Sequence, residues 1–242
     1  MTPRARLAHA KAYPFAAPDR SYLFVDGATR PLDRHPDLAG RTPVIACGSN
    51  RAPAHLARKF AHHPNTVIPV ERATLAEFDV VYSAHITRYG SIPATLIPSP
   101  GTRVALSLTW LDDRQLAVMH ETEGPGENYD YVCLERLALV TEAGHALAAA
   151  SVYRSRHGAL LEGGAPVALA AFTAQGRRFR ARDQVAVQRL VHDRLALGAA
   201  AGSLDRFILE SIEDDALRRR RIDDLRADAR PLAWPDARVV PV

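Results

Sequence analysis

The chain has 242 residues, of which 47% are apolar and 24% are charged, an ordinary composition for a globular protein. Its formal net charge is +4, and no stretch approaches the ~20 consecutive apolar residues that a membrane-spanning helix needs. The only two cysteines, Cys47 and Cys133, are too few for a disulfide framework, so we expect free thiols and a cytoplasmic location.

The opening segment, residues 1–40, is rich in proline, aspartate and arginine, which predicts an irregular lead-in. A short apolar run at residues 22–25 predicts one strand within it. Residues 43–47 form a second apolar run that stops at a glycine, which predicts a buried strand. We expect a helix over residues 53–61, where proline opens the segment and apolar residues recur four apart.

The next stretch is rich in strand signals. Four apolar or β-branched runs predict separate strands at residues 67–70, 80–82, 94–97 and 104–108. Turn signals are expected to separate these strands at Gly90, Pro98 and Pro100-Gly101.

A well-delimited helix follows. Asp112 can cap its N-terminus, with Gln115 placed for a capping box, and Gly124 with Pro125 supplies the stop. The chain then returns to strand over residues 129–140, where side chains alternate between two faces.

The last third is expected to be mainly helical. Residues 146–153 predict one more strand, with a helix as the alternative, and residues 183–228 have helical periodicity. Gly198 and Gly202 are expected to divide that stretch into at least two helices. We therefore predict an α+β protein in three parts: an irregular lead-in (1–40), a compact sheet or small barrel (41–175) and a C-terminal helical extension packed on it (176–242).

The turn Gly48-Ser49-Asn50 is the first candidate site. A buried strand ends there and a helix begins just beyond, so unpaired backbone amides and the helix dipole can hold an anion or an oxyanion. Gly48 would let a ligand approach the backbone closely. The alternative is a plain connection in which Ser49 or Asn50 caps the helix.

Glu123 is the second candidate. It ends a helix beside Gly124 and follows Glu121 by two residues. Helix carbonyls and a neighbouring acid disfavour a carboxylate charge, and such a setting suits a general acid/base. The alternative is an exposed acid near a helix end.

Both candidates fall within a wider resemblance. Residues 44–56 resemble the opening of the γ-glutamylcyclotransferase-like family, in which a first strand leads into an aromatic-Gly-Ser turn. Residues 93–104 are similar to the family's ATL-P-PG--V stretch, and residues 116–129 are similar to its L--LD--EG----Y stretch. The three motifs occur in the family's order and together span residues 43–135.

The resemblance implies a small mixed β-barrel with flanking helices and a site in the barrel mouth. It implies conversion of a small γ-glutamyl amide to 5-oxoproline and a free amine, with neither a metal nor an organic cofactor. Glu123 would be the catalytic acid/base. The implied substrate-binding residues are Cys47, Gly48, Ser49, Asn50 and Tyr129. We expect no nucleic-acid or membrane partner, and a homodimer is an open option.

The chain departs from the family pattern in three places. Cys47 stands where the family has an aromatic residue, Ala105 and Leu106 stand where a glycine follows the second motif, and His120 replaces the aspartate of the third motif. Tyr131 is close enough to compete with Tyr129 for the role of the downstream tyrosine. The resemblance therefore does not identify the leaving amine.

The sequence offers two other kinds of site. A cysteine hydrolase would use Cys47 with His55, His62, His63 or His120 as its base, but an apolar run favours a buried, inert thiol. A metal site at the first three of these histidines is disfavoured, because adjacent histidines point apart.

A non-enzymatic alternative stays open. The sheet domain could act as a binding or scaffolding module without turnover, with the arginine-rich C-terminal helices making the contacts. Acidic residues interleave those arginines over residues 210–224, which disfavours a continuous surface for nucleic acid.

Overall fold

The computed structural model describes residues 1–32, 36–195, 202–234 and 236–241. Gly198 lies outside the described residues, and Gly202 lies just before the fifth helix. Six α-helices and a short 3-10 helix, η1, occur in these ranges: α1 (Pro3–Lys11), η1 (Ser49–Arg51), α2 (Pro53–Lys59), α3 (Asp113–Glu123), α4 (Gln184–Leu195), α5 (Leu204–Glu213) and α6 (Asp215–Ala227).

Strands make up most of the rest. Those before α3 are β1 (Tyr22–Val25), β2 (Ala28–Pro31), β3 (Thr42–Ala46), β4 (Val67–Tyr82) and β5 (Ala94–Leu111). Those after it are β6 (Tyr129–Leu134), β7 (Leu139–Thr141), β8 (Ala146–Leu147), β9 (Ala150–Ser155), β10 (Leu161–Glu162), β11 (Ala165–Pro166), β12 (Ala168–Leu169), β13 (Ala174–Gln175), β14 (Ala181–Arg182) and β15 (Ala237–Val239).

The α+β class is confirmed, but the predicted barrel is wrong. Thirteen of the described strands form one sheet, whose main path runs β14-β12-β4-β5-β3-β9-β6-β15. The sheet is mixed, because β3 and β9 pair in parallel while β6 and β9 pair in antiparallel fashion. No pairing among the described strands joins β14 to β15, so the sheet stays open.

The expectation of four short strands within residues 67–108 is also wrong, because β4 and β5 form one long antiparallel hairpin. The prolines and the glycine at residues 98–101 cause an irregularity within β5, but they do not end the strand. The register shifts between Ala76 and Phe78, and Glu77 there has a positive φ of 65°. The Glu77 carboxylate accepts the Gly101 amide at 3.3 and 3.2 Å, which holds the bulge together.

Residues 1–40 are more regular than expected. The described part of this segment contains α1, which Thr2 caps through the amide of Ala5, and the predicted strand β1, which pairs with both β2 and β4. Lys11 of α1 forms an ion pair with Asp205 of α5. The lead-in therefore links the sheet to the C-terminal helices.

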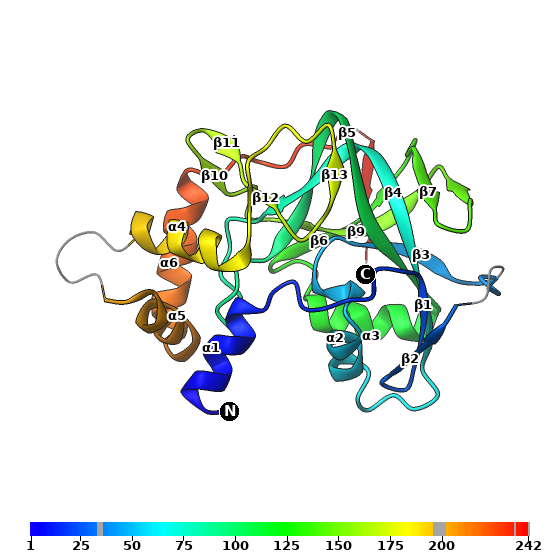
Figure 1. Ribbon diagram of the computed structural model, residues 1–242, viewed down its shortest axis with the longest axis horizontal. Coiled ribbons are helices and arrows are strands. Elements are labelled where there is room, and N and C mark those ends of the chain that lie inside the picture. The colour runs from blue at the N-terminus through cyan, green and yellow to red at the C-terminus, as the bar shows by residue number, and fades with distance from the viewer. Residues whose placement is uncertain (33–35, 196–201, 235, 242) are drawn as a thin grey trace.

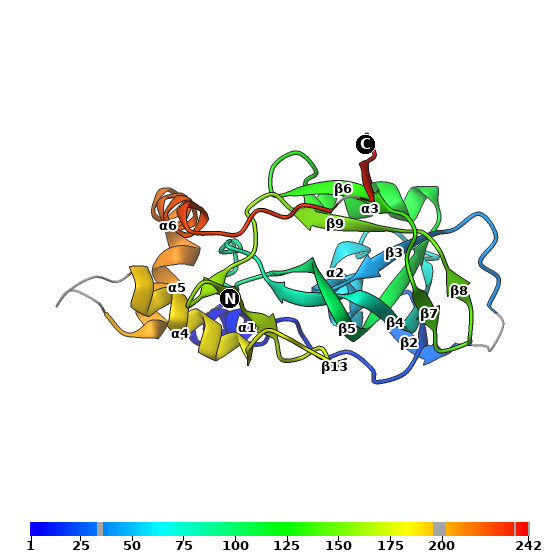
Figure 2. The same ribbon diagram turned by 90° about the horizontal axis from the view of Figure 1, so that it is seen from above.

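The helices cover the sheet in two groups. Figures 1 and 2 show α2 and α3 beside the sheet, with α1, α4, α5 and α6 gathered at one end of the molecule. Alternate residues of the central strands feed two apolar clusters: Val44 and Tyr131 belong to the one that includes Leu56 and Met119, whereas Ile45 belongs to the one that includes the C-terminal helices. Both faces of the sheet are therefore packed.

Several local predictions are confirmed. The capping box of Asp112 and Gln115 is present, and α3 ends at Gly124 in the left-handed conformation. The described parts of residues 183–228 are mainly helical as expected, and the strand predicted at residues 146–153 is present as β8 and β9. Within the described residues, no helix is long and apolar enough to cross a membrane. The division into three parts at residues 40 and 175 stays a prediction.

Candidate active site

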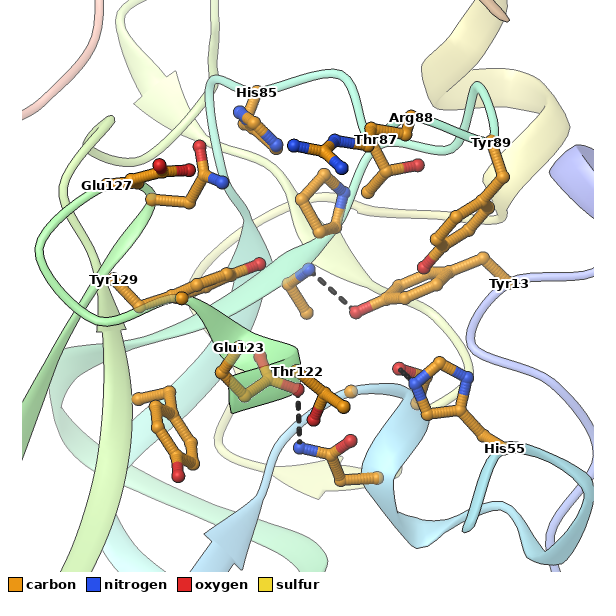
Figure 3. A pocket seen from close by; sticks show the side chains of 18 of the residues that line it. Tyr13, His55, His85, Thr87, Arg88, Tyr89, Thr122, Glu123, Glu127 and Tyr129 are labelled. Carbon is orange, nitrogen blue, oxygen red and sulfur yellow. Dashed lines mark hydrogen bonds between the residues drawn. The ribbon is translucent and has the colours of Figure 1, made fainter. Parts of the chain in front are cut away.

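A cavity of about 800 Å³ lies where the β3–η1 turn, the end of α3, the loop after β4 and helix α6 converge. Its lining includes every residue that the sequence predicted for the site: Cys47, Gly48, Ser49, Asn50, Glu123 and Tyr129. Residues that are far apart in the sequence therefore share one cavity, and Figure 3 shows the side chains that surround it.

Glu123 reaches this cavity from the last turn of α3. Its Oε1 accepts a hydrogen bond from Asn50 Nδ2 at 3.2 Å, which joins the two predicted candidates directly (Figure 3). The other side-chain atom of that amide, Asn50 Oδ1, is buried and has no hydrogen-bond partner among the described residues. A buried amide oxygen without a partner is costly, so this atom is ready to accept a hydrogen bond from a ligand.

Lys59 is the residue that the sequence analysis missed. Its ammonium forms an ion pair with Glu123 Oε1 and donates to Thr122 Oγ1 at 2.9 Å. The Lys59 side chain is 5% exposed and that of Glu123 is 15% exposed, so the pair is largely withdrawn from water. The sequence indicated only negative groups near Glu123, namely Glu121 and the helix carbonyls. The structure adds a buried cation, Lys59. One signal was available: Lys59 is one of two lysines in a chain with 31 basic residues.

Gly48 has a steric reason to be glycine. A Cβ atom built on it would lie 2.4 Å from Tyr13 Oη. That hydroxyl is held in place because it accepts the amide hydrogen of Ala94 at 2.8 Å. Tyr13 belongs to the N-terminal segment, so the turn is packed against a part of the chain that carries no motif.

Ser49 and His55 form a hydrogen bond, with Oγ and Nε2 3.1 Å apart. The other ring nitrogen, Nδ1, lies 3.1 Å from the Arg58 guanidinium, which can only donate. Nδ1 is therefore the acceptor, Nε2 carries the proton, and His55 donates to Ser49. Burial above all, and then Lys59 and Arg58, lower the pKa of His55 to about 2. His55 in this form cannot take a proton from Ser49, which disfavours a Ser-His nucleophile.

Three tyrosine hydroxyls point into the middle of the cavity in Figure 3, those of Tyr13, Tyr89 and Tyr129. Burial raises the pKa of Tyr13 and of Tyr129 well above the ordinary value, and burial with the charge of Glu123 raises that of Tyr89 to about 12. All three are therefore neutral hydrogen-bond donors at neutral pH. Tyr131 does not line the cavity, and its ring packs against His120 and Tyr153.

The positions that depart from the family pattern have different surroundings. Cys47 lines the cavity, but burial raises the pKa of its thiol to about 12, so the nucleophilic thiolate is disfavoured. His120 does not line the cavity, and its Nδ1 is 2.9 Å from Tyr153 Oη. In the described part of the chain, no group of three or more His, Cys, Asp or Glu side chains is placed to hold a metal ion.

No protein-family model matches the chain, and no curated protein matches it. Solved structures with a similar fold include a solution structure of a protein from Arabidopsis thaliana, with a TM-score of 0.38 and 19% identity over 50% of this chain and 72% of that one. A gamma-glutamyl cyclotransferase has a TM-score of 0.35 and 22% identity over 48% of this chain and 66% of its own. An uncharacterized protein from Homo sapiens has a TM-score of 0.37 and 21% identity over 48% of this chain and 67% of its own.

One of these structures carries the name of the family that the motifs resemble, and it matches about half of the chain. At TM-scores and identities this low, the likeness carries no argument about the reaction.

Proposed function

We propose that the protein converts a γ-glutamyl amide to 5-oxoproline and a free amine, with Glu123 as the acid/base. The observation that carries this proposal is the contact between Glu123 and Asn50 in the cavity, beside the Gly48 turn. Two of the three motifs that resemble the γ-glutamylcyclotransferase-like family supply these groups: residues 44–56 provide the turn and the Asn50 amide, and residues 116–129 provide the Glu123 carboxylate.

The reaction needs a base close to the substrate's α-amine. The amine nitrogen attacks the γ-carbonyl carbon and closes a five-membered ring, and its proton passes to the Glu123 carboxylate. The bond between the carbonyl carbon and the leaving nitrogen then breaks, and Glu123 returns the proton to that nitrogen. The same carboxyl group serves both steps, so it ends in its starting form.

The neighbouring groups suit the remaining tasks. Asn50 Oδ1, which lacks a partner among the described residues, would accept a hydrogen bond from the substrate amine and orient it toward Glu123. The backbone amides of the Gly48–Asn50 turn and the neutral tyrosine hydroxyls would stabilise the negative oxygen that develops on the carbonyl. Lys59 would hold the Glu123 carboxylate in position by its ion pair.

The test is release of 5-oxoproline from γ-glutamyl dipeptides, γ-glutamyl amines and glutathione by wild type and by Glu123→Gln. Loss of a positioned acid/base lowers turnover by about 10²- to 10⁴-fold, so we expect the variant to be nearly inactive. Asp113→Asn is the matched control, because Asp113 is an exposed acid on the same helix outside the cavity lining. A Glu123→Gln enzyme that keeps wild-type turnover would overturn the assignment.

The alternative, a binding module without turnover, predicts a different outcome. The wild type would then release no 5-oxoproline from any substrate of the panel, while γ-glutamyl compounds would still raise its melting temperature.

A further inference from the structure

The cavity has a second end, on the side of helix α6. In Figure 3, His85 and Arg88 lie at the opposite side of the cavity from Glu123, with Tyr13 and Tyr129 between them. Helix α6 lines this end with Asp215, Arg218, Arg219 and Ile222. The loop after β4 and helix α6 therefore enclose a part of the cavity to which the acid/base and the Gly48 turn do not contribute.

His85 is a buried polar side chain without a partner. It is 8% exposed, and neither of its ring nitrogens forms a hydrogen bond with any described residue. Its ring lies against that of His157, with centroids 4.3 Å apart and the two planes tilted by 30°. Burial, His157 and Arg218 lower the pKa of His85 to about 3, so the ring is neutral and has one N–H to donate. In the tautomer with the proton on Nδ1, this buried nitrogen, which has no partner among the described residues, would donate to an acceptor on a ligand.

Arg218 is fixed at this end. It is 7% exposed, its Nη1 donates to the Ser211 carbonyl at 2.8 Å, and its Nη2 pairs with Asp215. A guanidinium has five N–H groups, so these two contacts leave three of them for other acceptors. Arg88 is exposed, and its guanidinium points toward His85 in Figure 3. No ion pair of Arg88 occurs among the described residues.

The charges at this end favour a singly charged anion. Three arginines line it, Arg88, Arg218 and Arg219, together with the two carboxylates of Asp215 and Glu127. The balance is one positive charge, which matches a carboxylate better than a doubly charged phosphate.

We propose that the α6 end of the cavity binds a carboxylate on the leaving-amine part of the substrate, through Arg88, Arg218 and His85. The inference rests on the proposed function, because it assigns the two ends of one substrate to the two ends of the cavity. The preferred substrate class is then a γ-glutamyl amino acid or peptide, in preference to the γ-glutamyl derivative of a simple amine.

The test compares γ-glutamyl-alanine with γ-glutamyl-ethylamide, which lacks only the carboxylate. Because hydrogen bonds to charged groups are strong, we expect wild-type kcat/KM to favour γ-glutamyl-alanine by about tenfold or more. Arg88→Gln should lower that ratio toward one, mainly through a higher KM for γ-glutamyl-alanine. Arg88 is exposed, so the variant should fold, which circular dichroism would verify.

Arg178→Gln is the matched control, since Arg178 is also an exposed arginine but does not line the cavity. It should keep the wild-type ratio. A wild type without preference for the carboxylate substrate, or an Arg88→Gln variant that keeps the full preference, would overturn the subsite.

Calorimetric binding of the same two compounds separates the subsite from the proposed function. One outcome is that neither compound yields 5-oxoproline, but γ-glutamyl-alanine binds more tightly than γ-glutamyl-ethylamide and loses this advantage in Arg88→Gln. That outcome would support the subsite and overturn the proposed reaction. If neither compound is turned over and the two bind equally well, both the subsite and the proposed reaction are overturned.

Discussion

The two ends of the cavity are built from different kinds of sequence. The Glu123 end combines the β3–η1–α2 segment with the end of α3, and its predicted residues fall within motifs whose order along the chain is readable. The α6 end combines the loop after β4 with a C-terminal helix more than a hundred residues later, and of the residues assigned to it Glu127 alone falls within a motif. The residues of the Glu123 end could therefore be selected from the sequence, whereas the arginines and the histidine of the α6 end could not.

The largest expected effect on stability comes from breaking the buried ion pair between Lys59 and Glu123. Lys59→Met leaves the Glu123 carboxylate without its cation, and loss of one partner of a buried pair costs about 3 kcal/mol of unfolding free energy. We expect this loss in urea titrations, together with a large fall in 5-oxoproline release.

The double variant Lys59→Met/Glu123→Gln provides the check on this explanation. Without the charge of Glu123, it should recover part of the stability that Lys59→Met loses, but no activity. Equal stability of the single and double variants would show that the charge of Glu123 is not the cause.

The contact between Gly48 and Tyr13 joins the motif-bearing turn to the N-terminal segment. Gly48→Ala places a methyl group 2.4 Å from Tyr13 Oη, and overpacking of this kind costs about 2 kcal/mol. In a Tyr13→Phe background the nearest atom would be Cζ at 3.5 Å, an ordinary contact. We therefore expect Gly48→Ala to destabilise the Tyr13→Phe protein much less than the wild type in thermal unfolding, and equal costs would exclude this clash.

Each end of the cavity buries a neutral histidine, His85 at the α6 end and His55 at the Glu123 end. The protein should therefore lose stability in acid. The pKa of His85 is lowered from 6.5 to about 3, so below pH 6.5 the unfolded chain binds a proton that the folded chain does not. The free energy of unfolding then falls as the pH decreases, by about 1 kcal/mol per histidine between pH 6.5 and 5.5. His55, at the Glu123 end, acts in the same direction with a folded-state pKa of about 2.

The measurement is the free energy of unfolding from urea titrations at pH 6.5 and 5.5. His85→Gln should lose less stability than wild type over this interval, by about 1 kcal/mol. His62→Gln, which replaces an exposed histidine outside the cavity, should behave as wild type. An unchanged pH dependence in His85→Gln would contradict the buried neutral ring.

The smallest expected effect distinguishes the two tyrosines that the sequence left in competition. Tyr129 lines the cavity and Tyr131 packs against His120, so only Tyr129→Phe should lower kcat/KM. Loss of one neutral hydrogen bond corresponds to about fivefold. A fall in kcat/KM that is confined to Tyr131→Phe would reverse this assignment.

The sequence predicted local features well, because their causes are local. The capping box at Asp112, the stop at Gly124 and the helical period of the C-terminal stretch depend on residues within a few positions of one another. For the same reason, the Gly-Ser-Asn turn and Glu123 could be selected as candidates before any contact between them was known.

The features that the sequence missed depend on distant partners. The barrel was wrong because strand pairing decides whether a sheet closes, and the outermost strands β14 and β15 pair with different parts of the chain. The Pro98 to Gly101 signals predict the end of a strand, but the paired strand β4 accommodates them with a bulge at Glu77. Tyr13 could not be assigned to the cavity, because nothing in its own segment indicates what it packs against.

The most direct test of the proposed reaction is the fate of the carbonyl oxygen when γ-glutamyl-alanine reacts in water enriched in ¹⁸O. Attack by the substrate's own amine introduces no oxygen from the solvent, so the account predicts unlabelled 5-oxoproline and alanine as the products by mass spectrometry. Formation of glutamate with ¹⁸O in its γ-carboxylate would contradict it, since the nucleophile would then be water.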